Sequence, residues 1–228
     1  MTSKNLSFDL MKEELKRRLW ALALSMLAFF FALPVTYGLV ISNNAHSNYL
    51  TTVDTLAEST QAVLGYGNPI VVGVVVVIAF ICGLSSFYYL HSRKKVDFYH
   101  ALPVSRKTMF WVNYLGGICI FFFSYVVNLC IATIMSVING TMNGEMGLVL
   151  LQGAVVHTVY FLLIYTVAVL SAILTGNLVV NFLMVLGMSF YGNLVMSIYI
   201  LSMDEFFHSF CASYSGIWDY ALNLSPIT

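Results

Sequence analysis

Long apolar blocks alternate with short polar segments along the chain. Five of the blocks exceed 20 residues, the length that an α-helix needs to cross the hydrocarbon of a membrane. The second block is rich in valine, but its length and its lack of turn residues favour a membrane helix over a strand. The pattern therefore predicts an all-α fold, a polytopic membrane helical bundle within one transmembrane domain, residues 19–201. The five predicted spans are Leu19–Ile41, Pro69–His91, Thr108–Ile138, Leu148–Thr175 and Leu178–Leu201.

Composition and charge support this interpretation and add an orientation. Of the 228 residues, 60% are hydrophobic and only 9% are charged, whereas a soluble domain carries about 25% charged residues. Cytoplasmic loops keep Lys and Arg, because moving these residues across a bilayer is unfavourable. All ten basic residues lie in two segments, which predicts a cytoplasmic N-terminus and an external C-terminal segment. They are Lys4, Lys12, Lys16, Arg17 and Arg18 before the first span, and Arg93, Lys94, Lys95, Arg106 and Lys107 between the second and third.

Both terminal segments outside the spans have amphipathic patterns. Residues 1–18 place Phe8, Met11 and Leu15 on one helical face, which predicts a helix lying on the cytoplasmic membrane surface. A solvated extension of the first span is the alternative. Residues 202–228 carry aromatic side chains at helical spacing, which predicts an external helix that dips into the outer leaflet. A helical continuation of the fifth span would explain that pattern equally well.

The predicted spans contain no Asp, Glu, Lys or Arg. Their absence argues against an ion-coupled pump and against an intramembrane hydrolase. No carboxylate on the fourth span could orient His157, so we expect this histidine to form a hydrogen bond with a neighbouring helix. The spans also carry amides, which hold helices together or line a polar path, and the first role is favoured. These amides are Asn113, Asn128, Gln152, Asn181 and Asn193.

The sequence lacks two common chemical motifs. It contains no nucleotide-binding loop of the type G-x-x-x-x-G-K-[ST] and no CxxC pair. We therefore expect no catalytic residue, no metal and no cofactor on this chain, and no nucleic-acid partner. If ATP drives transport here, another subunit must bind it.

The segment between the second and third spans, residues 93–107, is the most distinctive stretch. It mixes basic residues with aromatic and aliphatic ones. Pro103 should end a short helix here, because proline disfavours helical geometry in the preceding residue. Ser105 can then cap the third span. Exposed aromatic residues on a short helix fit a groove on a partner protein, and an interfacial helix with its rings in the headgroups fits equally well.

The run Arg93-Lys-Lys-Val-Asp-Phe-Tyr-His-Ala-Leu-Pro-Val-Ser-Arg resembles the segment after the second span in permease subunits of bacterial type-2 ABC exporters. The resemblance is strongest to long permeases of Gram-positive bacteria, whose overall layout is also similar. It implies a multi-pass protein of the bacterial plasma membrane whose coupling helix docks into a separate ATPase subunit. It also implies a dimer with a second permease, and a sixth span after residue 228. The implied coupling residues are Lys95, Asp97, Phe98, Tyr99, His100, Leu102, Pro103 and Arg106.

Three functions remain as hypotheses at this point. The favoured one is a permease subunit of an ATP-driven exporter, since it explains the uncharged spans, the aromatic-basic segment and the missing nucleotide loop. The alternative is an ATP-independent secondary transporter or channel, which would move its substrate without a partner ATPase. A membrane enzyme or scaffold is the third, and an enzyme would need a reactive group near His157 or the external acidic residues.

Overall fold

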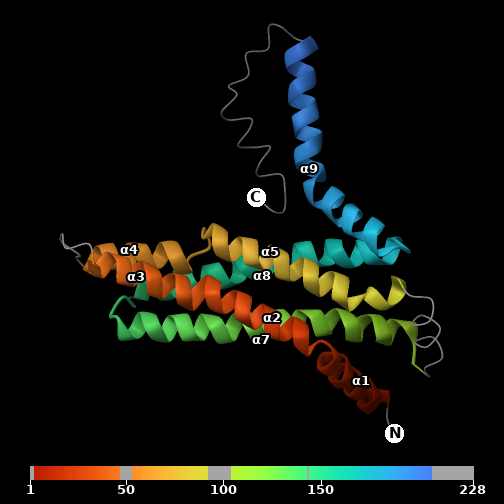
Figure 1. Ribbon diagram of the computed structural model, residues 1–228, viewed down its shortest axis with the longest axis horizontal. Helices are drawn as coiled ribbons and strands as arrows, with labels where there is room; N and C mark the ends of the chain where they lie inside the picture. The colour runs from red at the N-terminus through yellow and green to blue at the C-terminus, as the bar shows by residue number, and fades with distance from the viewer. Residues whose placement is uncertain (1–2, 47–52, 92–103, 143, 207–228) are drawn as a thin grey trace.

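The computed structural model describes residues 3–46, 53–91, 104–142 and 144–206. Within these residues the chain is all-α, and helices joined by turns account for its regular structure. The long apolar segments run side by side in alternating directions and form an elongated bundle (Figure 1). Consecutive segments therefore begin at opposite ends of the bundle.

In the part of the chain that the structure describes, four helical segments are long and apolar enough to cross a membrane, at residues 19–43, 56–86, 106–138 and 144–174. They overlap the first four predicted spans and indicate a multi-pass membrane protein. Their elements are α2 (Leu19–Phe30), η1 (Phe31–Val35) and α3 (Thr36–His46) in the first segment, α4 (Val53–Leu64) and α5 (Pro69–Ser86) in the second, α7 (Arg106–Ile138) in the third and α8 (Gly144–Leu174) in the fourth.

The fifth apolar block forms a helix but does not join the bundle. This helix, α9 (Leu178–Phe206), begins beside the end of α8, bends, and then points away from the other helices (Figure 1). Among the described residues the bundle thus has four candidate spans, and the fifth span that the sequence predicts is not seen within it. The helix continues past Leu201 to Phe206, and the later residues of the predicted external segment lie outside the described residues.

Local side-chain bonds explain where two of the long helices begin. Asn68 caps α5, because its side-chain oxygen accepts a hydrogen bond from the backbone N–H of Ile70 at 2.9 Å. Ser105 caps α7 by accepting from the N–H of Thr108 at 3.2 Å, which confirms the predicted cap. The second span ends at Ser86, earlier than predicted, and a short 3-10 helix, η2 (Tyr88–His91), follows it.

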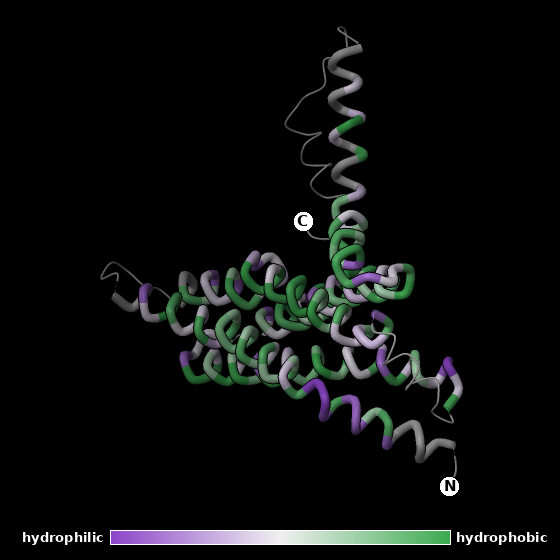
Figure 2. Tube along the Cα trace, turned by 45° about the vertical axis from the view of Figure 1, so that its right-hand side comes forward, coloured by the Kyte–Doolittle hydropathy of each residue, from purple (hydrophilic) through white to green (hydrophobic). Residues whose placement is uncertain are grey.

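A separate polar helix, α1 (Ser3–Arg17), precedes the bundle. The backbone leaves helical geometry at Arg18, with φ −106° and ψ 18°, so α1 departs from the direction of α2. Figure 2 shows the change from the hydrophilic α1 to the apolar bundle. On the apolar face predicted for this helix, Leu15 packs against the bundle core, and α1 lies against α7. Part of that face is therefore used for contact within the chain.

Aromatic side chains form a continuous column between α7 and α8. Phe121 of α7 and Phe161 of α8 stack with ring centroids 3.9 Å apart and an interplanar angle of 10°. Tyr125 stacks on Phe121 at one side, and Tyr165 stacks on Phe161 at the other. All four rings are almost fully buried. Contacts between stacked aromatic rings add to the stabilisation that burial alone gives.

Small residues let the helices approach closely around this column. A Cβ on Gly83 of α5 would clash with the Cβ of Ala168 on α8. A Cβ on Gly117 of α7 would overlap the hydroxyl of Tyr165 and would lie 2.8 Å from its ring. Glycine at these two positions is therefore a packing requirement, as in other membrane helix pairs.

The first span contains a wide turn. Residues Phe31–Val35 form η1, a single π-helical turn between α2 and α3, and Pro34 lies inside it. Proline has no N–H to donate, so it interrupts the regular α-helical bonds. The helix nevertheless continues to His46, and Ala32, Leu33 and Pro34 are buried.

Candidate functional site

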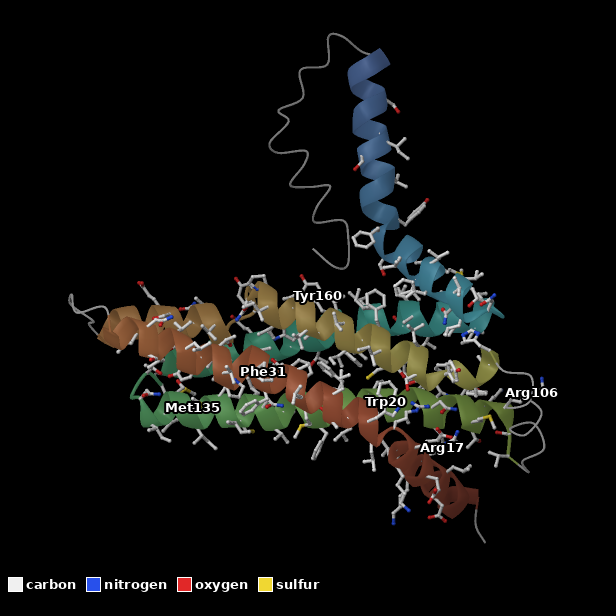
Figure 3. The ribbon with its side chains drawn as sticks, in the orientation of Figure 1. Arg17, Trp20, Phe31, Arg106, Met135 and Tyr160 are labelled. Atoms are coloured by element: carbon white, nitrogen blue, oxygen red, sulfur yellow. The ribbon has the colours of Figure 1, made fainter. Side chains whose placement is uncertain are left out.

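Several segment ends meet at one end of the bundle, which we call the Arg18 end. It holds the junction of α1 with α2, the end of α5, the start of α7 and the turn from α8 to α9 (Figure 1). Arg17 and Arg106 both lie there (Figure 3), whereas Glu58 of α4 and Glu145 of α8 lie toward the opposite end. The described parts of the two basic segments thus share one end of the bundle, as the sequence pattern predicts.

Arg18 is the central residue of this end. Only 6% of its surface is exposed. Its Nη1 donates a hydrogen bond to Ser86 Oγ at 2.8 Å, and its Nη2 donates to the Ser86 carbonyl at 3.1 Å. Nη2 also donates to Asn113 Oδ1 at 2.6 Å and lies 3.5 Å from Glu14 Oε2. One guanidinium therefore joins α1, α5 and α7.

These bonds explain how a charge can be buried here. An arginine in a low-dielectric environment is costly unless its N–H groups are bonded and its charge is balanced. The Glu14 carboxylate, itself 12% exposed, supplies the opposite charge. Asn113 keeps its own amide bonded to the Met109 carbonyl at 3.1 Å, which orients its oxygen toward Arg18. Residues of three elements thus supply one another with hydrogen-bond partners and balance the buried charge.

A chain of hydroxyl groups extends this cluster to α8. The Tyr165 hydroxyl donates to the carbonyl of Tyr114 at 2.9 Å and lies 3.2 Å from Ser86 Oγ. Because the single hydrogen of Tyr165 is used on Tyr114, Ser86 must donate to Tyr165 while it accepts from Arg18. Ser86, at the end of α5, is therefore bonded to Arg18 at the start of α2 and to Tyr165 of α8, and each of these two residues also bonds α7.

A second polar contact holds η2 against the start of α9. The Nε2 atom of His91 lies 3.1 Å from Asn181 Nδ2, and Asn181 Oδ1 accepts from Ser171 Oγ at 2.7 Å. The bond from Ser171 fixes the amide so that its NH₂ faces His91, which then accepts as a neutral imidazole. Burial lowers the pKa of His91 below its usual value, which favours that neutral form.

Most of the predicted coupling residues lie outside the described residues. Among them the structure describes Arg106, the first residue of α7. The flanks of the segment are well defined, because η2 ends at His91 and α7 begins after the cap at Ser105. Both flanks are at the Arg18 end, so the chain leaves and re-enters the bundle there. The residues outside the described ranges are Lys95, Asp97, Phe98, Tyr99, His100, Leu102 and Pro103.

The polar residues inside the spans mainly join helices. The Tyr125 hydroxyl lies 2.9 Å from His157 Nδ1, which confirms that His157 bonds a neighbouring helix. Asn128 of α7 donates to the Met26 carbonyl of α2 at 3.2 Å, and Ser25 and Ser124 bond at 2.6 Å between the same helices. These bonds confirm the interhelical role predicted for the amides Asn113, Asn128 and Asn181.

Gln152 departs from that pattern, because it is exposed on the surface of α8. The side chain of Asn193 lies outside the described residues. Two of the five predicted amides therefore have no observed role between helices of the bundle.

The burial of Arg18 and the role of Ser86 are not predicted from the sequence. The pattern places Arg18 at the end of an interfacial helix, among topological charges, and the structure corrects this by burying it. A signal was present in Asn113, an amide two turns into the third span that needs a polar partner. Ser86 gives no comparable signal, because small hydroxyl residues are common in membrane helices.

A cavity of about 540 Å³ adjoins the Arg18 cluster, between α1, α2, α5, η2 and the start of α9. Across the described residues, no group of three or more His, Cys, Asp or Glu side chains could hold a metal ion.

No protein-family model, curated protein or solved structure matches the chain. The likeness to type-2 ABC exporter permeases therefore stays a prediction drawn from residues 93–106.

Proposed function

We propose that this chain is a membrane-spanning permease subunit of an ATP-driven transporter of the exporter type. Residues 93–107 would form a coupling helix that a separate ATPase subunit grips from the cytoplasm. The chain would lie in a bacterial plasma membrane with its N-terminus inside, and a second permease would complete the transporter. Four candidate spans supply the membrane domain, and α9 would become the fifth span in the assembled complex.

One observation carries this proposal: Arg18 bonds both helices that flank the coupling segment. Ser86 is the last residue of α5, and Asn113 lies in the second turn of α7. A displacement of residues 92–105 would therefore reach α2, α5 and α7 through a buried charge. Loops that serve only to connect spans do not require such a link.

The absence of charge within the predicted spans supports an external source of energy. A gradient-driven transporter usually carries an ionisable group in the membrane to bind its coupling ion. Here the predicted spans hold no Asp, Glu, Lys or Arg, and His157 is already bonded to Tyr125. An ATPase on a separate subunit would supply the energy for transport instead, since ATP hydrolysis needs no ion site within the permease.

The test uses the chain reconstituted in liposomes with the ABC ATPase subunit that it is proposed to bind. Tyr99→Glu and Leu102→Glu place a charge on the apolar face that would enter the ATPase cleft. We expect both variants to insert normally and to lower substrate-stimulated ATP turnover to the level of the ATPase alone. Asn139→Glu, at an exposed position just after α7 and outside the candidate spans, introduces the same charge at the opposite end of the bundle and should leave turnover unchanged.

Two results would contradict this function. One is unchanged ATP turnover in the Tyr99 and Leu102 variants, which would remove the segment from the coupling pathway. The other is substrate uptake into liposomes that contain the chain alone, because a gradient-driven transporter or channel would then explain the protein without an ATPase.

A further inference from the structure

The cavity beside Arg18 is not used by the proposed coupling mechanism. It has a volume of about 540 Å³, and its wall comes from both the polar and the apolar parts of the chain. Glu14 and Arg17 of α1 and Arg18 line one part of it. Ile81 and Leu84 of α5 line another. A cavity with this division suits an amphipathic ligand better than a wholly polar or a wholly apolar one.

The charged part of the wall is positive. It contains two guanidinium groups and one carboxylate among the described residues. The Glu14 carboxylate lies 3.1 Å from Arg17 Nη1 and 3.5 Å from Arg18 Nη2, so one negative charge is shared between two positive ones. Arg18 is turned inward to Ser86 and Asn113, whereas the Arg17 side chain is 54% exposed. Arg17 is therefore the cation that an incoming anion would meet.

Aromatic residues indicate the level within a membrane at which the cavity lies. Trp20, Tyr88 and Tyr89 all line it. Tryptophan and tyrosine concentrate where membrane hydrocarbon meets the headgroups, because their rings are apolar and their N–H or O–H groups are polar. The cavity also lies where the hydrophilic α1 meets the apolar α2, as Figure 2 shows. A bilayer around the bundle would place its headgroups at this level.

From these observations we infer that the cavity is a binding site for one anionic phospholipid. The lipid phosphate and its headgroup bind beside Arg17, and an acyl chain runs along Ile81 and Leu84 of α5. Phosphatidylcholine, which is zwitterionic, binds less well, because its quaternary ammonium group adds a positive charge next to Arg17. The bound lipid contacts α1, α5 and α9 and so links the polar helix to two helices of the membrane domain.

The test is native mass spectrometry of the full chain, purified in mild detergent with an equimolar mixture of phosphatidylglycerol and phosphatidylcholine. Both lipids carry the same acyl chains. We expect the protein to retain phosphatidylglycerol about fivefold more than phosphatidylcholine, since one basic residue near an anionic headgroup contributes about that factor. Arg17→Gln should bring the ratio close to one. Lys12→Gln removes the same charge from an exposed position on α1 that does not line the cavity, and should keep the preference.

Two further measurements separate the parts of the site. Leu84→Trp fills the apolar part and should lower retention of both lipids, and a melting curve must show that this variant is folded. Glycerophosphoglycerol, the headgroup without acyl chains, should fail to displace bound phosphatidylglycerol at equal concentration. Equal retention of the two lipids by the native chain would overturn the inference. Equal losses in the Arg17 and Lys12 variants, or displacement by the free headgroup, would overturn it as well.

Discussion

The guanidinium of Arg18 shows how one residue can organise a whole end of a helical bundle. It replaces water with five polar contacts, to Glu14, to Ser86 and to Asn113. Hydrogen bonds to a charged group are stronger than those between neutral groups, and burial strengthens them further. The same burial makes the arrangement intolerant of change, because a lost partner leaves a polar or charged group unsatisfied.

Arg18→Met should therefore lower the free energy of unfolding by about 3 kcal/mol or more, since it leaves Asn113 Oδ1 and the Ser86 carbonyl buried without the guanidinium that they bond. Arg17→Met removes an exposed ion pair from the same carboxylate and should cost less than about 1 kcal/mol. Detergent-based unfolding curves of the two purified variants measure the difference. Equal effects would mean that the buried bonds contribute no more than the exposed pair.

Gly117→Ala should lower the free energy of unfolding by about 1–3 kcal/mol, because its methyl group would overlap the Tyr165 hydroxyl and ring. Tyr165 would have to move, and its bonds to Tyr114 and Ser86 would be strained with it. Gly73→Ala on α5 is the matched control. Its Cβ would meet nothing within 4 Å, and alanine favours a helix over glycine. A stable Gly117 variant would show that α7 and α8 can separate freely.

Single residues also mark the limit of sequence-based prediction here. The spacing of Glu14 and Arg18 predicts an i,i+4 ion pair, and the structure has it at 3.5 Å. Ser105 was predictable as a cap for the same reason, since both depend on neighbours along the chain. The contacts of Arg18 with Ser86 and Asn113 were not predictable, because they join positions 68 and 95 residues apart.

At the scale of elements, the contact between η2 and α9 holds His91, just before the proposed coupling segment. His91 accepts from Asn181, whose amide is fixed by Ser171 of α8. A protonated imidazole cannot accept that bond, and it would face the NH₂ group with a second donor. The connection between η2, α8 and α9 therefore depends on the protonation state of a single side chain.

Acidification should weaken this contact. The pKa of His91 is lower in the folded chain than in the unfolded one, so its contribution to stability is fully present above about pH 6.5 and declines as the pH falls through the folded pKa. The protection factors of backbone amides in the first turns of α9, which correct for the intrinsic rise of hydrogen exchange with pH, should be lower at pH 5.5 than at pH 8. His91→Gln should remove most of that pH dependence, and His46→Gln at the far end of α3 should retain it. Identical pH profiles for all three proteins would exclude His91 as the responsible group.

The elements themselves were largely predictable, and their mutual placement was not. Length and hydropathy identify the helices, since each block must satisfy its own backbone within the membrane. The direction of α9 depends on contacts with other segments, such as the bond between Ser171 and Asn181. No periodic pattern along α9 encodes those contacts. The sequence consequently predicts α9 as a helix but does not predict that it leaves the bundle.

At the scale of the whole molecule, the bundle presents large apolar side chains on its outer faces. Trp111, Phe123 and Ile134 of α7 are each more than half exposed, and so are Leu148 and Leu151 of α8. A water-soluble monomer rarely shows so extensive an apolar surface. Lipid would cover these faces, and a second permease would cover part of them in the proposed transporter.

The wide turn at η1 sets the rotational phase of the first span. Ala21, Ser25, Phe29, Leu33 and Tyr37 are all buried, and each follows the previous one by four positions. In an unbroken α-helix every such step would rotate the side chain by about 40°, so Tyr37 would lie about 160° around the axis from Ala21. A π turn holds more residues per turn and cancels much of that drift. Residues four positions apart would otherwise rotate away from the core along the helix. The π turn at Pro34 thus keeps these side chains in one stripe that faces the core along the entire span.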